Sequence, residues 1–333
     1  MTSTVPLIDR QGRVHTSLRV SVTDRCNIRC FYCMPAGDIQ FVPRAEMLTF
    51  EEILRFVRIV SELGVTKVRL TGGEPLLRKE LPRLIRMLRE LPMIEDLALT
   101  TNGILLAQQA KPLRDAGLNR LNISLDTLTE ETFQKISRRE GLHRVLEGIQ
   151  AAQQADFDEV RLNALAIRGV NEADIVPLGE FARNQGLQLR FIEFMPLDAE
   201  QNWEGGQVLL GAAIRRRLEE AFGPLLPTDR DDPSRPARDY VFADGVGSVG
   251  FIDSVSEPFC EACNRLRLTA EGQVRNCLFS IEEWDARALL RSDASDQQIV
   301  DLVRSSVDAK KPGHGIDTED FVRPVRAMYQ IGG

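Results

Sequence analysis

From residue 18 to about residue 222, short apolar runs alternate with amphipathic segments of helical period. This alternation is typical of βαβ units, in which parallel strands are joined by crossover helices, and it restricts this part of the chain to an α/β architecture. The pattern predicts six strands, at residues 18–22, 67–71, 97–100, 120–124, 160–167 and 188–195.

Six βα units are too few for a complete eight-stranded barrel of about 250 residues, so we expect an incomplete (βα)6 barrel with one open side. Beyond it, the periodicity changes to short strands and two helices. The polar, proline-broken stretch 227–236 predicts a linker or exposed loop. We therefore expect a barrel at 1–225, a linker at 226–239, and a small C-terminal α+β domain at 240–333 that covers the open side.

Three cysteines, Cys26, Cys30 and Cys33, follow the first predicted strand with the spacing C-x3-C-x2-C. Thiolates are the usual ligands of iron–sulfur clusters, and three of them on a four-iron cubane leave one iron open to a substrate. A disulfide is disfavoured because no segment resembles a secretory signal and cytosolic thiols stay reduced. Structural zinc would need a fourth ligand, and the chain has only 3 histidines.

The other half of the chain's 6 cysteines forms a second group, which predicts a second, separate site. Its members are Cys260, Cys263 and Cys277. Arg265 and Arg267 follow directly and alternate on one face of a predicted strand, where guanidinium groups suit bidentate recognition of phosphate. Two alternatives stay open, a zinc site completed by His314 and a solvated charge pair for the arginines.

Further motifs fall at the carboxyl ends of predicted strands, where functional groups of parallel α/β folds collect. The run Gly72-Gly73-Glu74-Pro75 would let the backbone approach a ligand closely, although an ordinary tight turn explains it as well. Tyr32, Ser124 and Met195 offer an aromatic ring, a hydroxyl and apolar packing for a nucleoside. Each of these three also fits a purely structural role.

Arginines interrupt three of the apolar strand runs, at Arg19, Arg69 and Arg161. An unpaired charge is costly to bury, so an anionic ligand would explain them. The alternative is pairing with carboxylates such as Glu74 or Glu193. The hydroxyls expected beside the same ligand are those of Thr100 and Thr101.

The chain ends in Gly332-Gly333. A frayed terminus is one interpretation. The other is that two glycines thread the backbone into a narrow cavity where a side chain would clash.

The charge balance argues against broad binding to nucleic acids or membrane surfaces, because 42 basic and 49 acidic residues give a net charge of −7. No apolar stretch approaches the roughly 20 residues of a transmembrane helix. We expect a soluble cytoplasmic protein that binds neither nucleic acid nor membrane.

Together these motifs resemble those of the GTP 3′,8-cyclases, the radical S-adenosylmethionine (SAM) enzymes of molybdenum cofactor biosynthesis. The resemblance covers about residues 18–333. It rests on both cysteine groups and on the segments Thr71-Gly72-Gly73-Glu74-Pro75, Leu99-Thr100-Thr101-Asn102-Gly103, Ser124-Leu125-Asp126, Arg190-Phe191-Ile192-Glu193-Phe194-Met195-Pro196, Asn264-Arg265-Leu266-Arg267 and Ile331-Gly332-Gly333.

The resemblance implies two [4Fe–4S] clusters, the first held by Cys26, Cys30 and Cys33 and the second by Cys260, Cys263 and Cys277. The implied SAM contacts are Tyr32, Gly73, Ser124 and Met195. The implied GTP contacts are Arg19, Arg69, Thr100, Arg161, Arg265, Leu266 and Arg267. The terminal Gly332 and Gly333 would enter the catalytic pocket. One departure is Arg161, where the family commonly has a lysine.

The implied reaction is the radical cyclisation of GTP to (8S)-3′,8-cyclo-7,8-dihydroguanosine 5′-triphosphate. The implied partners are a flavodoxin- or ferredoxin-like electron donor and, downstream, cyclic pyranopterin monophosphate synthase; a homodimer is compatible with the family. The residues leave two alternative functions open. One is a peptide-modifying radical SAM maturase with an auxiliary cluster, and the other is a cluster-containing redox sensor without enzymatic activity.

Overall fold

The computed structural model describes residues 5–230, 232–316, 318–319 and 321–333. It contains a 12-stranded sheet in the order β12-β11-β10-β1-β2-β3-β4-β5-β6-β9-β8-β7. The strands are β1 (Ser17–Ser21), β2 (Lys67–Thr71), β3 (Asp96–Thr101), β4 (Arg120–Ser124), β5 (Glu159–Ala166), β6 (Gln188–Glu193), β7 (Leu225–Pro227), β8 (Arg238–Phe242), β9 (Ser248–Ile252), β10 (Arg265–Leu268), β11 (Gln273–Arg275) and β12 (Trp284–Asp285).

The six predicted strands are confirmed as β1 to β6, and they pair in parallel in chain order. The C-terminal part extends this sheet at both edges, because β10 pairs in parallel with β1 and β9 pairs in parallel with β6. The outermost strands on each side pair antiparallel. The sheet therefore curves into a barrel that stays open between β12 and β7.

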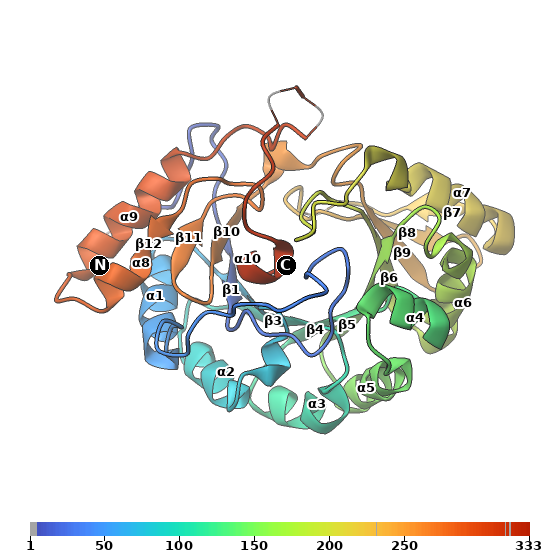
Figure 1. The fold of residues 1–333 in the computed structure, drawn as a ribbon, viewed down its shortest axis with the longest axis horizontal. Coiled ribbons are helices and arrows are strands. Elements are labelled where there is room, and N and C mark those ends of the chain that lie inside the picture. The colour runs from blue at the N-terminus through green and yellow to red at the C-terminus, as the bar shows by residue number, and fades with distance from the viewer. Residues whose placement is uncertain (1–4, 231, 317, 320) are drawn as a thin grey trace.

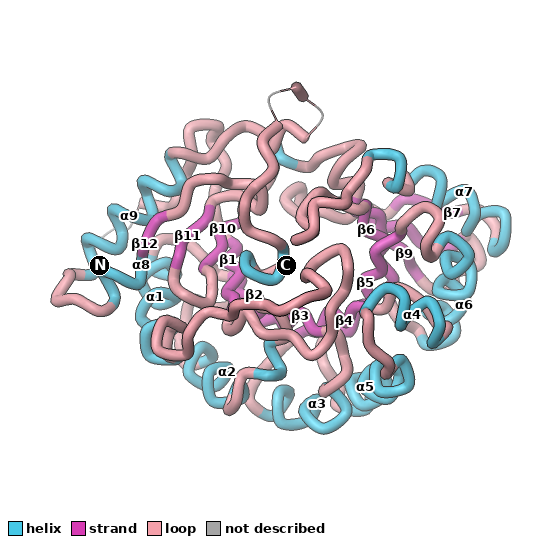
Figure 2. The backbone as a smooth tube through the Cα atoms, in the orientation of Figure 1, coloured by secondary structure: helices cyan, strands magenta, loops and turns pink. Residues whose placement is uncertain are grey.

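The longer helices cover the convex face of the sheet, and the C-terminus lies near the centre of the barrel (Figures 1 and 2). The helices are α1 (Phe50–Glu62), α2 (Leu81–Arg89), α3 (Leu106–Asp115), α4 (Glu130–Ser137), α5 (Leu142–Gln154), α6 (Ile175–Gln185), α7 (Gly211–Phe222), α8 (Ala286–Leu290), α9 (Asp296–Asp308) and α10 (Met328–Ile331). No described helix is both long and apolar enough to cross a membrane.

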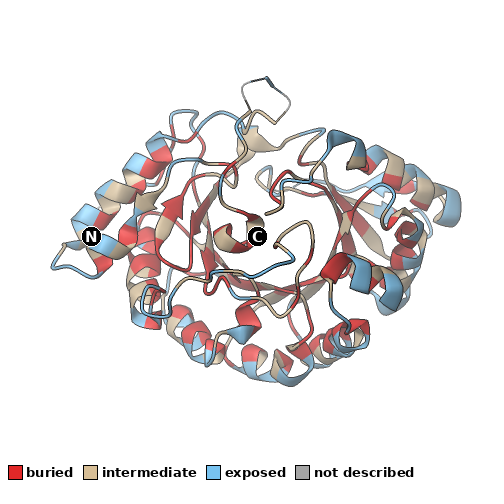
Figure 3. Ribbon diagram, viewed as in Figure 1, coloured by how far each residue is buried: buried red, intermediate tan, exposed pale blue. Residues whose placement is uncertain are grey.

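Helix α1 shows how local sequence produces these elements. The Thr49 hydroxyl accepts the backbone N–H of Glu52 at 3.1 Å, and the Glu52 carboxylate accepts the backbone N–H of Thr49 at 2.7 Å. This capping box satisfies two amides that the first turn leaves without partners. The apolar stripe that includes Phe56, Val57 and Val60 is fully buried against the sheet, as the helical period predicts (Figure 3).

The segment 226–239, predicted as a linker or exposed loop, contains the end of β7, the start of β8 and the loop that joins these two paired strands. Its residues Asp232, Ser234, Arg235 and Pro236 line the central cavity. The division into domains at 225 and 240 remains a prediction, since strands from the C-terminal part pair directly with the barrel strands.

Candidate active site

A cavity of about 590 Å³ lies inside the curve of the sheet. At the carboxyl ends of the strands its wall includes Cys26, Cys30 and Cys33, and at the amino ends it includes Ser17 and Lys67. The cavity therefore runs along the barrel and joins the first cysteine loop to a cationic region.

The first cysteine loop packs closely against the two glycines that follow β2, Gly72 and Gly73. A Cβ atom on Gly73 would lie 2.4 Å from the carbonyl oxygen of Arg25, and one on Gly72 would lie 2.5 Å from that of Thr23. The Gly73 backbone N–H instead donates to the Thr23 carbonyl at 2.7 Å. Glycine is required here because the strand end and the loop approach too closely for a side chain.

Both a carboxyl group and a cation lie near the first triplet: Glu74 is close to Cys26, and Arg29 donates to the Cys26 backbone carbonyl at 2.6 Å. Burial, and next the nearby Glu74 carboxyl, raise the pKa of Cys26 to about 11, and burial raises the pKa values of Cys30 and Cys33 as well. The Asn102 amide donates to the Cys26 sulfur at 3.6 Å. Thiols of this kind stay protonated at neutral pH unless a metal binds them, which fits metal ligands rather than free nucleophiles.

Glu74 forms no ion pair with any arginine in the described part of the chain. Its carboxylate accepts the Thr101 hydroxyl at 2.7 Å and the backbone N–H of Asn102 at 2.8 Å, while burial raises its pKa to about 7. Glu193 likewise accepts the N–H groups of Val255 and Ser256. The carboxylate partners considered for the strand arginines are thus engaged elsewhere.

The four predicted SAM contacts, Tyr32, Gly73, Ser124 and Met195, all line the cavity that the first triplet also borders. The Tyr32 hydroxyl donates to Asp126 at 2.7 Å, and burial raises the pKa of Asp126 to about 6. Asp126 was not predicted as a site residue, although it is the last residue of the segment Ser124-Leu125-Asp126 that supports the family resemblance.

Four arginines line the cavity without an ion pair to any described residue; they are Arg19, Arg69, Arg265 and Arg267. Burial and the neighbouring arginines lower the pKa of Arg69 to about 9, and burial with Arg265 does the same for Arg267. Arg265 stacks 4.5 Å from the Phe259 ring centroid, and its Nη2 has no hydrogen-bond partner. Four cations of this kind favour an anionic ligand.

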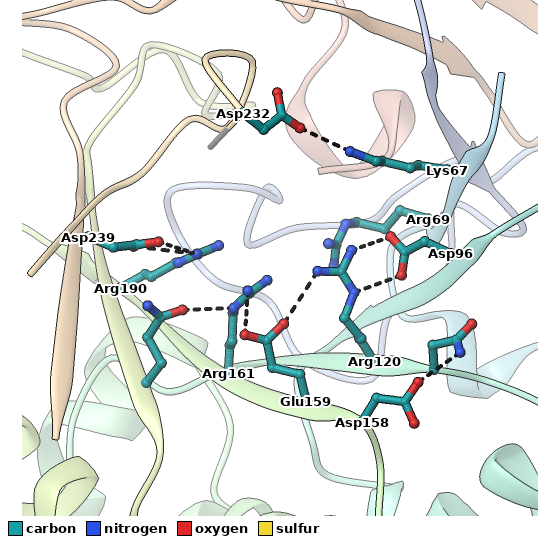
Figure 4. Close-up of polar contacts among 12 residues, drawn as sticks. Lys67, Arg69, Asp96, Arg120, Asp158, Glu159, Arg161, Arg190, Asp232 and Asp239 are labelled. Atoms are coloured by element: carbon teal, nitrogen blue, oxygen red, sulfur yellow. Dashed lines mark hydrogen bonds and ion pairs between the residues drawn. The ribbon is translucent and has the colours of Figure 1, made fainter. Parts of the chain in front are cut away.

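A second set of cations is already paired with carboxylates (Figure 4). Arg120 donates to Asp96 at 2.7 Å, Lys67 contacts Asp232 at 2.9 Å, and Arg190 contacts Asp239 at 3.0 Å. Arg120, Lys67 and Arg190 line the cavity but were not predicted. The rule that selected Arg19 and Arg69, a charge within an apolar strand, would also have found Arg190.

Two predicted GTP contacts are not part of the cavity wall. Arg161 pairs with Glu159 and donates to the Gln188 side-chain oxygen at 2.8 Å. Leu266 is 1% exposed and packs in the hydrophobic core, because neighbouring residues of β10 point to opposite faces. Thr100 does line the cavity, and its hydroxyl is 3.4 Å from Arg69.

Two asparagines that line the cavity were also missed, Asn122 and Asn163. The Oδ1 atom of each is buried and has no hydrogen-bond partner among the described residues. Since buried polar atoms are normally satisfied, these oxygens fit contacts to a bound ligand.

The second triplet lies outside the cavity wall in a cationic environment, with Cys260 and Cys263 just before β10 and Cys277 just after β11. Burial alone would raise the pKa of Cys263, but the charges of Arg265 and Lys310 lower it to about 7. The backbone N–H of Phe279 donates to the Cys277 sulfur at 3.4 Å. Hydrogen bonds to sulfur and nearby positive charge are common features of iron–sulfur sites.

The zinc alternative for the second triplet is disfavoured by His314. Its Nε2 is 3.1 Å from the Ser254 carbonyl oxygen, and its Nδ1 accepts the backbone N–H of Ile316 at 3.1 Å. Both ring nitrogens therefore contact the main chain. No group of His, Cys, Asp or Glu among the described residues converges on a single metal ion, whereas a four-iron cluster holds its thiolates further apart.

Comparisons with known proteins agree with this site. The model of the "Radical SAM superfamily" matches residues 20–182, and that of "Molybdenum Cofactor Synthesis C" matches residues 187–316. The chain is thus a radical SAM enzyme, and SAM with one [4Fe–4S] cluster belongs to that class. The cysteine loop and the cavity beside it fit both SAM and a [4Fe–4S] cluster.

The curated relatives define the family. A GTP 3′,8-cyclase of Rhodopirellula baltica is 52% identical, covering 100% of this chain and 94% of the relative. One of Corynebacterium glutamicum is 46% identical, covering 98% and 89%. The chain belongs to the GTP 3′,8-cyclase family.

Solved structures show the same fold. Streptococcus suis SuiB bound to S-adenosylmethionine gives a TM-score of 0.61 at 16% identity, over 87% of this chain and 64% of that chain. SuiB bound to the precursor peptide SuiA gives 0.62 at 16% identity, over 92% and 68%. At this identity the likeness concerns the fold alone.

Proposed function

We propose that this protein cyclises GTP to (8S)-3′,8-cyclo-7,8-dihydroguanosine 5′-triphosphate, the first step of molybdenum cofactor biosynthesis. The observation that carries the proposal is the set of unpaired arginines in the same cavity as the first cysteine loop. Membership of the GTP 3′,8-cyclase family supports the substrate.

Cys26, Cys30 and Cys33 would hold the [4Fe–4S] cluster, which together with SAM supplies the radical that removes the C3′ hydrogen of the ribose. Tyr32, Ser124 and Met195 line the adjacent part of the cavity, which suits the nucleoside of SAM.

The triphosphate would bind among Arg19, Arg69, Arg265 and Arg267. A nucleoside triphosphate carries a charge of about −4 at neutral pH, which matches these cations in number and sign. The arginines that are already paired with carboxylates, including Arg161, would support the wall rather than grip the phosphates. The phosphate contact that the family lysine would make at position 161 is thus proposed for one of the arginines Arg19, Arg69, Arg265 and Arg267 instead.

We further propose a second [4Fe–4S] cluster on Cys260, Cys263 and Cys277, close to β10, that holds the guanine base. The C-terminal tail would complete the cavity between the two sites. The backbone N–H of Tyr329 hydrogen-bonds Cys33, and the Gly332 carbonyl accepts Arg267 at 2.5 Å. A Cβ atom on Gly332 would lie 2.6 Å from the Thr71 hydroxyl, so only glycine fits there.

The proposed partners follow from the reaction. The first cluster needs one electron at a time, which a flavodoxin- or ferredoxin-like protein would supply. Cyclic pyranopterin monophosphate synthase would consume the product, and the cytoplasm, where thiols stay reduced, is the proposed location. A homodimer is the proposed assembly.

One anaerobic assay tests the proposal. The reconstituted protein is incubated with SAM, dithionite and GTP, and both 5′-deoxyadenosine and a GTP-derived cyclic nucleotide are quantified. We expect both products, with 5′-deoxyadenosine alone when GTP is left out. Formation of 5′-deoxyadenosine without a GTP-derived product under all conditions would favour the peptide-modifying alternative, and no SAM cleavage would favour the redox sensor.

A further inference from the structure

Lys310 is a buried lysine that contacts Cys263 of the second cysteine triplet. The reaction described above does not use this residue. Its side chain is 4% exposed. The ammonium donates to the Cys263 sulfur at 3.6 Å and to the carbonyl oxygen of Arg265 at 2.9 Å. It therefore touches a proposed cluster ligand and the strand that carries two proposed GTP contacts.

No described carboxylate lies within ion-pair distance of this ammonium. Burying a cation without a counter-charge is costly. The charged groups that act on Lys310 are the thiols of Cys263 and Cys277 and the cations Arg13 and Arg265. Negative charge at this place must come from the cysteines, as it does when thiolates bind a metal cluster.

The surrounding chain fixes the lysine in position. Arg13 donates to the carbonyl oxygens of Cys260 at 2.8 Å, Lys311 at 2.8 Å and Pro312 at 3.1 Å. The carboxylate of Asp9 in turn orients Arg13, with Nε to Oδ2 at 2.6 Å. One guanidinium thus ties the segment after α9 to the loop that carries the first cysteine of this triplet.

We propose that Lys310 is a positioning residue of the second cysteine centre: its ammonium donates both to the Cys263 sulfur and to the Arg265 carbonyl, and so ties that ligand to the backbone of β10 beside the GTP arginines. The inference rests on the second cluster proposed above. Three thiolates on a four-iron cluster leave a net negative charge, and the buried ammonium offsets it. An N–H···S contact from a cation favours the more reduced, more negative cluster.

The first triplet offers the internal contrast. There the corresponding donor is the neutral amide of Asn102, 3.6 Å from Cys26. The lysine is therefore not a general requirement of cysteine ligation in this fold. It belongs to the centre that is expected to face the anionic substrate.

The test isolates the second cluster in the full-length chain by replacing Cys26, Cys30 and Cys33 with alanine. In this parent, Lys310→Met is compared with Lys310→Arg and with Lys311→Met, a neighbouring exposed lysine that serves as the matched control. Iron and sulfide per chain, the electron paramagnetic resonance spectrum and the reduction potential are measured after anaerobic reconstitution.

We expect Lys310→Met to disfavour cluster reduction about tenfold, a shift of about 59 mV to more negative potential for one electron. Lys310→Arg should recover most of the shift, and Lys311→Met should match the parent. Loss of the cluster from Lys310→Met with retention in Lys310→Arg would also support the proposal, because arginine keeps the positive charge that methionine lacks.

An unchanged potential in a fully loaded Lys310→Met protein would overturn the inference while leaving the second cluster intact. Loss of the cluster from both Lys310 variants, with the control loaded, would overturn it too, because a cation alone would then not suffice. If the parent itself binds no cluster, the second cluster of the proposed function fails, and the inference fails with it.

Discussion

The two cysteine triplets have the same ligand type but different electrostatic surroundings. Near the first triplet lie the carboxyl groups of Glu74 and Asp126 together with one cation, Arg29, and the pKa of Cys26 is raised to about 11, chiefly by burial. Near the second lie Lys310 and Arg265, and the pKa of Cys263 is lowered to about 7. An acidic environment suits the cationic sulfonium and ammonium groups of SAM, whereas a cationic one suits a nucleoside triphosphate. Charge, more than ligand identity, separates their proposed roles.

The largest effect should come from the first triplet. Cys26→Ala removes one of three cluster ligands and should abolish both SAM cleavage and GTP cyclisation, because both depend on the same radical. The measurements are 5′-deoxyadenosine and cyclic nucleotide formation, with Cys277 intact as an internal control for iron at the second site. SAM cleavage at the wild-type rate would contradict the role of this triplet.

Cys277→Ala tests the second triplet in the same comparison. We expect GTP cyclisation to be lost while some uncoupled SAM cleavage remains, since the first triplet is untouched. The two products are quantified in the same reaction. Equal loss of both activities, with the first cluster still present by iron analysis, would argue against the division of roles.

Deletion of Gly332-Gly333 addresses the segment between the triplets. Both clusters should remain, but turnover should be suppressed, because the tail fills space that Thr71 and Arg267 border. Iron content and product formation are measured together, and a chain lengthened by two glycines is the matched control. Normal turnover in the shortened chain would show that the tail has no role.

Arg265→Gln weakens the cationic side while leaving the first triplet unchanged. Hydrogen bonds to charged groups contribute about 1.5–3 kcal/mol, so the KM for GTP should rise about 10- to 150-fold. The KM for SAM should stay as in the wild type. A rise of both constants by the same factor would indicate a general packing defect.

The smallest effect concerns stability near the second triplet. Burial lowers the pKa of His15 from 6.5 to about 4. The unfolded chain therefore binds this proton more readily than the folded chain, and stability is lost as the pH falls from about 6.5 toward 4. Between pH 7 and pH 5 the loss should be about 2 kcal/mol, which His15→Gln should remove. Urea unfolding of the cluster-free proteins at both pH values measures it, and an equal loss in both proteins would refute it.

The sequence-based predictions were most successful where a local pattern specifies the element. Strands β1 to β6 follow from the hydrophobic period of residues within a few positions of one another. Tyr32, Gly73, Ser124 and Met195 were placed at one cavity because they stand at or near strand ends, which meet at one edge of a parallel sheet.

Predictions were incomplete where side-chain direction and distant pairing decide the outcome, and the GTP contacts expected of Arg161 and Leu266 stay predictions. Arg161 and Leu266 share strands with cavity residues, yet one is held by Glu159 and Gln188 and the other faces the core. The extension of both sheet edges by β9 and β10 depends on contacts between segments far apart in the sequence. No local pattern reports such pairing.

The sequence by itself determined the chemistry, because the cysteine spacing and the glycines after a strand are local motifs. They can be interpreted without knowing where other segments lie. Only the tertiary structure decided which cations remain without a carboxylate partner. It also placed Lys310 against Cys263 across 47 positions of sequence. Electrostatic environment depends on distance in space and on burial, and the fold alone sets both.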